Sequence, residues 1–551
     1  MDKQKICRCL NEEYIGNITD TSSTTCKINV KQGIENISSG CILYLDTRRD
    51  VCSDSATLAI VTRISCCERP FSEYYEGERS DTTYLSTILD AVLIGSVSTE
   101  EPYIFSRHAT APNISVRSFR MKDEDFKQIF SSTGMNRLDI GVFSDFNCDA
   151  SVDGNKLLQR HLAILGSTGS GKSWAVSKLL EKLKNLKSTN VIIMDIHGEY
   201  NQSSFDKISI SGFGEDNSLI LPYWLLNSTE LVNMFIDRSE YTAQNQVSVF
   251  LKTVLAEKIR YANAYGHTEL INSLTVNSPV QFDINRVIDE LESLDTEMEC
   301  GSRGGQRQGK FYGYFTRVIS RMKNRIADKR YSFLFRECDL SLLDIVNKLL
   351  STEISSIKAI DFSDVPVEIL PTVVGIVARI IYQTQLWTSP RNRHPILIVA
   401  DECHVYIQRD NNQTTSNSSK IFERIAKEGR KLGIAAAIIS QRPSEVSETI
   451  LSQISNMIVL KTTNQRDKGI ISSLLPDNFS GLIDTLSSLD VGECIVVGDA
   501  VELPLRILLS KPDDPPSSQT IDFYSDWSSK PPMTRSQYEE SISNMQQQRR
   551  E

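Results

Sequence analysis

The 551-residue chain has no run of apolar residues long enough to cross a membrane. Its most apolar runs are HPILIVA, GIAAAIIS and VVGIVARIIY, whereas a membrane-spanning helix needs about 20 mostly apolar residues. Runs of this length are typical of buried strands or of a core helix. The opening sequence, MDKQKICRCLNEEYIG, also lacks the apolar segment of a secretory signal. We therefore expect a cytoplasmic protein.

Cysteine and excess basic charge are also scarce. The 12 cysteines are too dilute for a disulfide scaffold, and spacings such as Cys7/Cys9 and Cys66/Cys67 give no paired Cys-x-x-Cys zinc pattern. We expect reduced, structural thiols. With 60 Lys and Arg against 70 Asp and Glu, the net charge is −10. This excludes a basic protein that coats nucleic acid non-specifically, so a DNA-binding protein of this composition must concentrate its positive charge locally.

At roughly 150 residues per domain, the length predicts three or four domains. Residues 1–115 contain short β-rich runs separated by Ser, Gly, Asp and Asn, which predicts a small N-terminal β-barrel. Residues 116–156 are interpreted as a connector. Residues 511–551 are rich in Pro and Ser and are expected to form an extended tail.

Between the connector and the tail, apolar strands alternate with helical patterns. This alternation predicts an α/β core with a mostly parallel sheet, formed by residues 157–219 and 346–510. Residues 220–345 interrupt it with long helical patterns. We interpret this segment as a helical subdomain inserted between strands of the core.

A glycine-rich segment follows the first core strand. Residues 166–173 read GSTGSGKS and match G-x-x-x-x-G-K-[ST] between an apolar strand and an amphipathic helix. The glycines let backbone N–H groups surround phosphate oxygens, and the helix N-terminus adds partial positive charge. Lys172 would reach the β- and γ-phosphates of ATP, and Ser173 would ligate Mg²⁺. The expected nucleotide-binding residues here are Gly166, Ser167, Thr168, Gly169, Ser170, Gly171, Lys172, Ser173 and Trp174.

An acidic pair ends another apolar strand. The run ILIVADE places Asp401 and Glu402 at the carboxyl edge of a buried strand. There Asp401 can hold Mg²⁺ through water, and Glu402 can polarise the attacking water. The adjacent acids favour ATP hydrolysis over a GTPase switch. The alternative is that they only cap the next helix.

The next helix and strand supply two further candidates. Gln441 ends the strand GIAAAIISQ and can sense the γ-phosphate, with a simple strand-end turn as the alternative. Arg430 ends the preceding helix and is a candidate arginine finger acting on a neighbouring subunit, which requires a ring. Four other cations fall on one face of that helix, namely Lys420, Arg424, Lys427 and Lys431. For Lys420 and Lys427 a solvated surface is the alternative.

Several segments resemble the HerA family of hexameric DNA-translocating ATPases, within the wider HerA/FtsK group. They are RHLAILGSTGSGKS (160–173), MDIHGEY (194–200), DFSDVPVEILP (361–371), VADE (399–402), EGRKLGIAAAIISQRPSEV (428–446) and VGECIVVGDAVELP (491–504). The resemblance covers about residues 10–510 and is specific in the core but weak in the barrel and the insertion. It implies a RecA-like P-loop core, a six-membered ring with ATP sites between subunits, and duplex DNA in the central channel.

The resemblance also implies residue roles. Lys172 and Ser173 would bind the phosphates and Mg²⁺, and Asp401 and Glu402 would bind the metal and the attacking water. Gln441 would sense the γ-phosphate, and Arg430 would be the arginine finger that acts on a neighbouring subunit.

Four more residues match the family pattern less securely. Arg160 is implied as a second trans arginine, with a surface charge at the strand edge as the alternative. Asp195, His197 and Glu199 match the family's D-x-H-G-E-Y and are expected near the nucleotide, although His197 as a simple turn residue is equally open.

Two segments are candidates for gripping DNA. Loops after core strands usually face such a pore, which indicates Arg409 and the polar loop 408–420, although its stretch NNQTTSNSS offers few cations. Arg303 and Arg307, in the Gly/Arg loop 301–309, are the alternative.

These observations predict a translocase or helicase on double-stranded DNA that forms a homo-hexamer. The sequence shows no nuclease signature, so the resemblance implies a separate NurA-type nuclease, or a defence effector such as a sirtuin-like subunit, in DNA end processing or anti-phage defence. The alternative is an ATP-regulated ring scaffold that assembles and activates an effector enzyme. A conjugative coupling or packaging ATPase is a third interpretation, and the lack of a membrane segment argues against the coupling version.

Overall fold

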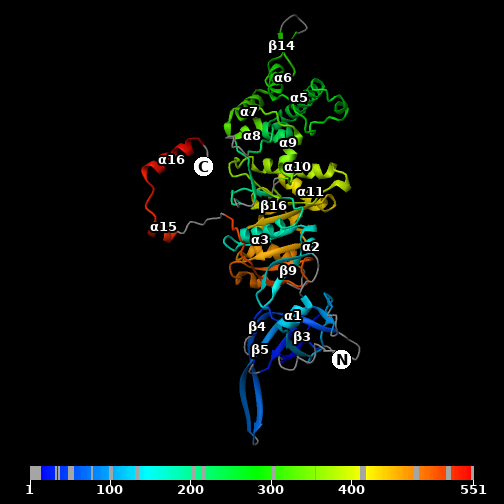
Figure 1. Cartoon of the computed structure of the whole chain (residues 1–551), viewed down its shortest axis with the longest axis vertical. Coiled ribbons are helices and arrows are strands. Elements are labelled where there is room, and N and C mark those ends of the chain that lie inside the picture. Colours follow the sequence, from blue (N-terminus) through cyan, green and yellow to red (C-terminus); the bar gives the residue numbers. More distant parts are fainter. Residues whose placement is uncertain are drawn as a thin grey trace. The chain divides into compact units, whose positions relative to one another are not determined.

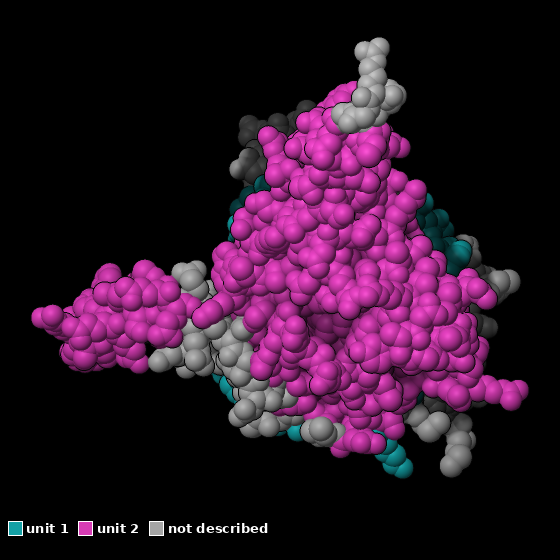
Figure 2. Space-filling view, turned by 90° about the horizontal axis from the view of Figure 1, so that it is seen from above, with its two compact units in different colours: residues 1–187, 435–515 teal, residues 188–434, 516–551 magenta. Residues whose placement is uncertain are grey.

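The computed structural model describes residues 14–31, 34, 37–46, 55–75, 78–98, 104–130, 136–200, 205–211, 218–300, 306–353, 355–409, 417–475, 483–516 and 523–547. The chain forms two compact units, residues 1–187 with 435–515 and residues 188–434 with 516–551 (Figure 2). Across the described ranges, no helix combines the length and the apolar character that crossing a bilayer requires.

The N-terminal strands close into a barrel in the first unit (Figure 1). They are β1 (Tyr14–Thr21), β2 (Thr25–Val30), β3 (Ile42–Leu45), β4 (Ser55–Tyr75), β5 (Glu78–Ser98) and β7 (Arg117–Arg120). Neighbouring strands follow the order β2-β1-β7-β3-β4-β5, and β5 pairs back with β2. The short β6 (Phe105–Ser106) adds to β5. The predicted β-barrel is therefore confirmed.

Strand β3 shows how the barrel joins the rest of its unit. All four of its residues are buried. Because successive side chains of a strand point to opposite faces, Leu43 and Leu45 contribute to the barrel interior. Ile42 and Tyr44 instead pack in a second apolar cluster, which includes Leu165 of the core. Barrel and core of this unit thus share one hydrophobic cluster.

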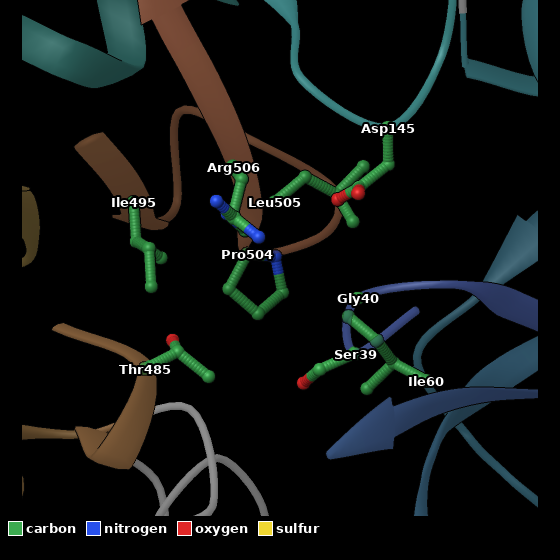
Figure 3. Close-up of a pocket in the computed structure, with 9 residues that line it drawn as sticks. All are labelled: Ser39, Gly40, Ile60, Asp145, Thr485, Ile495, Pro504, Leu505 and Arg506. Atoms are coloured by element: carbon green, nitrogen blue, oxygen red, sulfur yellow. The ribbon is translucent and has the colours of Figure 1, made fainter. Parts of the chain in front are cut away.

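A small gap lies beside this cluster (Figure 3). Its volume is about 10 Å³, room for one water at most. Gly40 lies against Asp145, whose carboxylate oxygen would be 2.6 Å from a Cβ at position 40. Arg506 pairs with Glu493 at 2.9 Å. Burial raises the pKa of Asp145 while the charge of Arg506 opposes that rise. We interpret the gap as part of the packing between barrel and core.

The core strands of the first unit form a mixed sheet. β17 (Ile434–Ser440), β10 (Leu162–Leu165) and β18 (Asn456–Leu460) are adjacent and parallel. The antiparallel strands β19 (Glu493–Gly498), β20 (Leu505–Leu509), β8 (Arg137–Phe143) and β9 (Asp149–Asp153) follow. Helices of this unit include α1 (Asp123–Phe130), α2 (Gly154–Gln159), α3 (Lys172–Lys184), α12 (Glu448–Leu451) and α13 (Gln465–Leu474).

The interpretation of residues 116–156 as a mere connector is wrong. This stretch contains α1, β8, β9 and α2, and β8 pairs with β20 at the edge of the sheet. The physical reason is apolar alternation along RLDIGVF, which buries Leu138 and Ile140.

The second unit contains four parallel strands in the order β12 (Asp206–Ser209), β15 (Ile357–Asp361), β11 (Val191–Asp195) and β16 (Ile396–Ala400). Helices α10 (Leu370–Trp387) and α11 (Asn417–Leu432) pack against each other. Between β12 and β15 lie α4 (Ser228–Phe235), α5 (Ala243–Ala264), α6 (Ile284–Thr296), α7 (Thr316–Ala327), α8 (Ser332–Phe335), α9 (Leu342–Leu350) and the hairpin β13 (Met298–Cys300) and β14 (Gln306–Gln308). Together the units confirm an α/β fold with a mostly parallel core sheet and inserted helices.

The expectation of an extended tail over residues 511–551 is wrong in part. Helices α15 (Phe523–Ser529) and α16 (Arg535–Gln547) form there. Ion pairs one helical turn apart support them, between Lys530 and Asp526 at 2.7 Å and between Arg535 and Glu539 at 3.0 Å. The Pro residues that suggested an extended chain all lie outside the two helices, whereas most of the Ser residues lie within them.

Candidate functional site

The GSTGSGKS segment forms the turn between β10 and α3. Gly169 (φ 73°) and Gly171 (φ 101°) adopt left-handed backbone conformations that favour glycine. Gly166 is required for a different reason, because a Cβ there would lie 2.6 Å from Ser170 Oγ and 2.9 Å from the Cβ of Leu460. The shape of this turn therefore depends on glycine at three positions of the motif.

Backbone bonds hold the turn against neighbouring strands. The Ser167 N–H donates to the Lys461 carbonyl at 2.8 Å, and the Gly492 N–H donates to the Ser170 carbonyl at 3.0 Å. The Lys172 ammonium donates to the Ser167 carbonyl at 3.3 Å, so its side chain folds back over the loop. With the N-terminus of the 13-residue α3 below it, the turn has the features that bind a polyphosphate.

Gln441 lies beside this turn. It directly follows β17, and its side-chain carbonyl accepts a hydrogen bond from the Thr168 hydroxyl. Trp174, in the first turn of α3, is 39% exposed, and the Lys511 ammonium lies 5.8 Å from its ring centroid. The first unit thus bonds Gln441 to the turn over which the Lys172 side chain folds.

Arg160 has a partner in its own chain. Its guanidinium lies 2.5 Å from a carboxylate oxygen of Asp499, and both side chains are partly exposed. Arg107 donates to the carbonyl of Gly498 at 3.0 Å on the same segment. Exposed pairs of this kind contribute about 0–1 kcal/mol, so an exchange of Asp499 for a phosphate costs little. The trans role of Arg160 stays a prediction.

In the second unit, carboxylates gather at the ends of three adjacent parallel strands. Asp195 ends β11, Asp361 ends β15, and Asp401 follows β16. Asp401 is buried, and burial, then Glu402 and Asp195, raise its pKa well above the usual value. Buried carboxylates in such mutual repulsion are stabilised in their charged form by a divalent cation. Asp361 is paired with Lys207 at 2.9 Å, so Asp401 is the carboxylate of the three that best suits a ligand of Mg²⁺.

The Asp195 carboxylate also has a structural task. One oxygen accepts the backbone N–H groups of His197, Gly198 and Glu199, and the other accepts that of Tyr200 at 3.0 Å. The carboxylate therefore fixes the HGEY turn, in which Gly198 is left-handed (φ 72°) and His197 is exposed. Glu199 contributes negative charge to the surroundings of Asp401. Contact of this turn with a nucleotide stays a prediction.

Glu402 has an unusual backbone conformation. Its φ of 40° and ψ of 43° lie in the left-handed region, which costs a non-glycine residue about 1–3 kcal/mol and occurs most often at functional sites. Its carboxylate lies 3.3 Å from Nδ1 of His404, and both side chains are largely buried. His404 was not among the predicted residues, although its position two residues after Glu402 was a usable signal.

The remaining candidates are dispersed. Arg430 is exposed in the last turn of α11. Arg409 is half-buried beyond the 3-10 turn Cys403–Val405 that follows β16, and Arg307 is exposed in β14. Arg303 and residues 410–416 of the polar loop lie outside the described residues.

Protein side chains alone do not form a metal cage here. Within the described ranges, no group of three or more His, Cys, Asp or Glu side chains could hold a metal ion. Mg²⁺ is usually held by one or two carboxylates together with substrate phosphates and water. The buried carboxylate of Asp401 suits that arrangement.

Comparisons with known proteins identify relatives of the chain. Residues 138–381 match the family model described as Helicase HerA, central domain. The DNA double-strand break repair helicase HerA of Saccharolobus solfataricus is 30% identical over 391 residues, covering 70% of each chain. Its namesake in Sulfolobus acidocaldarius is 29% identical over 71% of this chain and 72% of its own. Among solved structures, the plasmid coupling protein TrwB with an ATP analogue matches at 12% identity and a TM-score of 0.45, covering 73% of this chain and 95% of TrwB.

Proposed function

Because the chain belongs to the HerA helicase family, we propose that it is an ATP-driven translocase or helicase on double-stranded DNA. The observation that carries the proposal is the glycine-dependent turn at residues 166–173, with Lys172 folded over it at the N-terminus of α3. The relatives from Saccharolobus solfataricus and Sulfolobus acidocaldarius are both described as DNA double-strand break repair helicases. We place its activity in the cytoplasm.

The nucleotide roles follow from the chemistry of each residue. Backbone N–H groups of residues 166–173 and the Lys172 ammonium bind the phosphates of ATP, and the Ser173 hydroxyl with Asp401 holds Mg²⁺. When bound, Mg²⁺ neutralises charge on the phosphates. Glu402 orients and deprotonates the attacking water, and Nδ1 of His404 lies 3.3 Å from its carboxylate.

Two residues connect hydrolysis to a ring. Gln441, bonded to Thr168, reports whether the γ-phosphate is present. The exposed Arg430 at the end of α11 is the finger that a neighbouring subunit receives. A six-membered ring supplies such a neighbour at each nucleotide, and duplex DNA passes through its channel.

The partner is a separate enzyme. We propose a NurA-type nuclease, which would act in DNA end processing, or a defence effector such as a sirtuin-like subunit, which would act against phage. The alternative function is an ATP-regulated ring scaffold that assembles and activates such an effector. The net charge of −10 favours it, because a DNA-tracking surface then depends on local cations alone.

Displacement of a third strand from a linear triplex tests translocation directly. The wild-type protein should release the third strand only with ATP, and Glu402→Gln should release none. A protein that hydrolyses ATP while the third strand stays bound to the duplex would support the scaffold instead.

A further inference from the structure

A polar pocket of about 290 Å³ lies between three helices of the second unit. The N-terminal turn of α4 forms one wall, α10 a second and the first turns of α11 the third. Gly375 lets α10 approach the start of α11 closely, because a Cβ there would lie 3.2 Å from the Ser418 nitrogen. The volume far exceeds what one ordered water needs, so the pocket has room for a ligand group.

The pocket carries net positive charge. Its lining contains three bases, Arg379, Lys420 and Arg424, and one acid, Glu230, so the net charge is 3 − 1 = +2. Glu230 is buried and forms an ion pair at 2.6 Å with the largely buried Arg379. The other two bases of the lining are Lys420 and Arg424, which are exposed on α11.

Arg424 is held in place by an aromatic ring. Its guanidinium lies 4.8 Å from the Tyr382 ring centroid and donates to the Tyr382 hydroxyl at 3.2 Å. That hydroxyl in turn donates to the Glu428 carboxylate. A stacked guanidinium loses less side-chain entropy when it binds an anion. Arg424 is thus prepared for a ligand rather than merely solvated.

Neutral donors complete the pocket. Ser228 and Thr229 line it at the N-terminus of α4, where Asn227 caps the helix, and the amide of Gln383 faces it from α10. The Nε–H of Arg379 is buried and has no hydrogen-bond partner among the described residues. Arginine, lysine, hydroxyl and amide side chains are donors that proteins use for nucleic-acid phosphates.

The positive charge continues along α11 beyond the pocket. Lys427 and Lys431 are exposed, and at 100° per residue they fall within about 60° of Lys420 and Arg424 on one helix face. At 1.5 Å per residue this row is about 16 Å long. A single small anion would use only the pocket, whereas a chain of phosphates would use the whole row.

We propose that this pocket and the α11 row bind the sugar-phosphate backbone of nucleic acid, with one phosphate seated between Lys420 and Arg424. The inference rests on the proposed function and assigns its DNA contact to α11, which begins inside the segment 408–420 that the sequence suggested and continues beyond it. The contacts are to phosphate and are therefore independent of base sequence.

Binding of the full chain to a short fluorescent DNA duplex, followed by anisotropy at increasing salt, tests the assignment. Lys420→Gln should weaken binding severalfold and lower the slope of log affinity against log salt by about 0.9, as expected for one lost phosphate contact. Lys420→Arg keeps the charge and should bind like the wild type. Lys252→Gln, an exposed lysine of α5 outside the pocket, makes the same charge change and should keep the wild-type slope.

The outcomes distinguish failure of the α11 assignment from failure of the proposed function. A wild-type slope in Lys420→Gln would overturn the inference, while duplex binding by the wild type would leave the proposed function standing. Failure of the wild type to bind duplex would overturn both. If Lys420→Gln does not fold, Lys427→Gln carries the same expectation. Inorganic phosphate, added at the same concentration as the phosphate groups of the duplex, should not displace the duplex. Displacement under that condition would indicate a small-anion site and overturn the nucleic-acid assignment.

Discussion

The hydroxyl of Thr168, in the P-loop, donates a hydrogen bond to the side-chain carbonyl of Gln441 at the end of β17. The bond links the phosphate-binding turn to a strand whose other end follows α11 and Arg430. A side chain at this point can respond when a γ-phosphate enters or leaves the turn. Along the chain, β17 thus separates the proposed sensor from the helix that carries the proposed finger.

Replacement of Gln441 tests its role as a sensor. Gln441→Ala should lower kcat for ATP hydrolysis by about tenfold or more with little change in KM, because the lost contact acts on the transition state more than on bound ATP. Steady-state ATPase assays measure this. Thr168→Ser keeps the hydroxyl and is the control. A raised KM at unchanged kcat would show that Gln441 serves ground-state binding only.

Lys172→Ala should weaken ATP binding at least about tenfold, since a charge-assisted bond to the phosphates is lost. Calorimetric titration with a non-hydrolysable ATP analogue gives the affinity. Lys184→Ala changes an exposed lysine at the other end of α3 and should bind as the wild type does. Equal affinity of both variants would contradict the assignment.

Glu402→Gln should still bind ATP but turn over at least about 100-fold more slowly, because the amide cannot accept the proton of the attacking water. Single-turnover hydrolysis with saturating protein separates this from a binding defect. Glu290→Gln, on the exposed face of α6, is the matched control. Hydrolysis at the wild-type rate by Glu402→Gln would remove this residue from the mechanism.

Mixed rings test whether Arg430 acts on a neighbour. Arg430→Ala and Lys172→Ala rings should each be inactive, whereas mixing the two before assembly should restore part of the ATPase activity, because some interfaces then contain both intact groups. Native mass spectrometry verifies that mixed rings form. Mixed rings without activity would rule out the trans role.

Lys258 gives the inserted helices a specific pH dependence. It is fully buried, donates to the carbonyls of Val276 and Ser278, and burial lowers its pKa from 10.5 to about 8. Between these two values the unfolded chain holds the proton and the folded chain does not, so the free energy of unfolding should rise with pH by up to about 1.4 kcal/mol per pH unit. Below pH 8 both the folded and the unfolded chain hold the proton, so the unfolding free energy gains nothing from this group.

Urea unfolding at a series of pH values measures this effect. Lys258→Met removes the titrating group and should abolish the rise, while Lys252→Gln should retain it. A wild-type unfolding free energy that stays flat from pH 8 to 10.5 would contradict the assignment.

Local sequence patterns predicted much of the fold and of the candidate site. The P-loop turn follows from spacing alone, since glycine at 166, 169 and 171 is needed wherever that turn forms. The buried strands β11 and β16 were predicted as apolar runs. The first run ends in Asp195, and the second ends one residue before Asp401.

Features that depend on distant partners could not be predicted. Closure of the barrel needs pairing of β2 with β5, about 60 residues apart. The bond of Arg160 to Asp499 joins residues 339 positions apart, and nothing in the sequence near Asp195 shows that four backbone N–H groups occupy its carboxylate. The left-handed backbone of Glu402 is likewise imposed by its surroundings.

The ATPase rate of the full chain with and without linear duplex DNA tests the central claim most directly. A motor should hydrolyse ATP several-fold faster with duplex, and the stimulation should fall steeply with salt because phosphate contacts release counterions. An unchanged rate with duplex, together with acceleration by an effector protein, would contradict a DNA-driven motor and favour the scaffold.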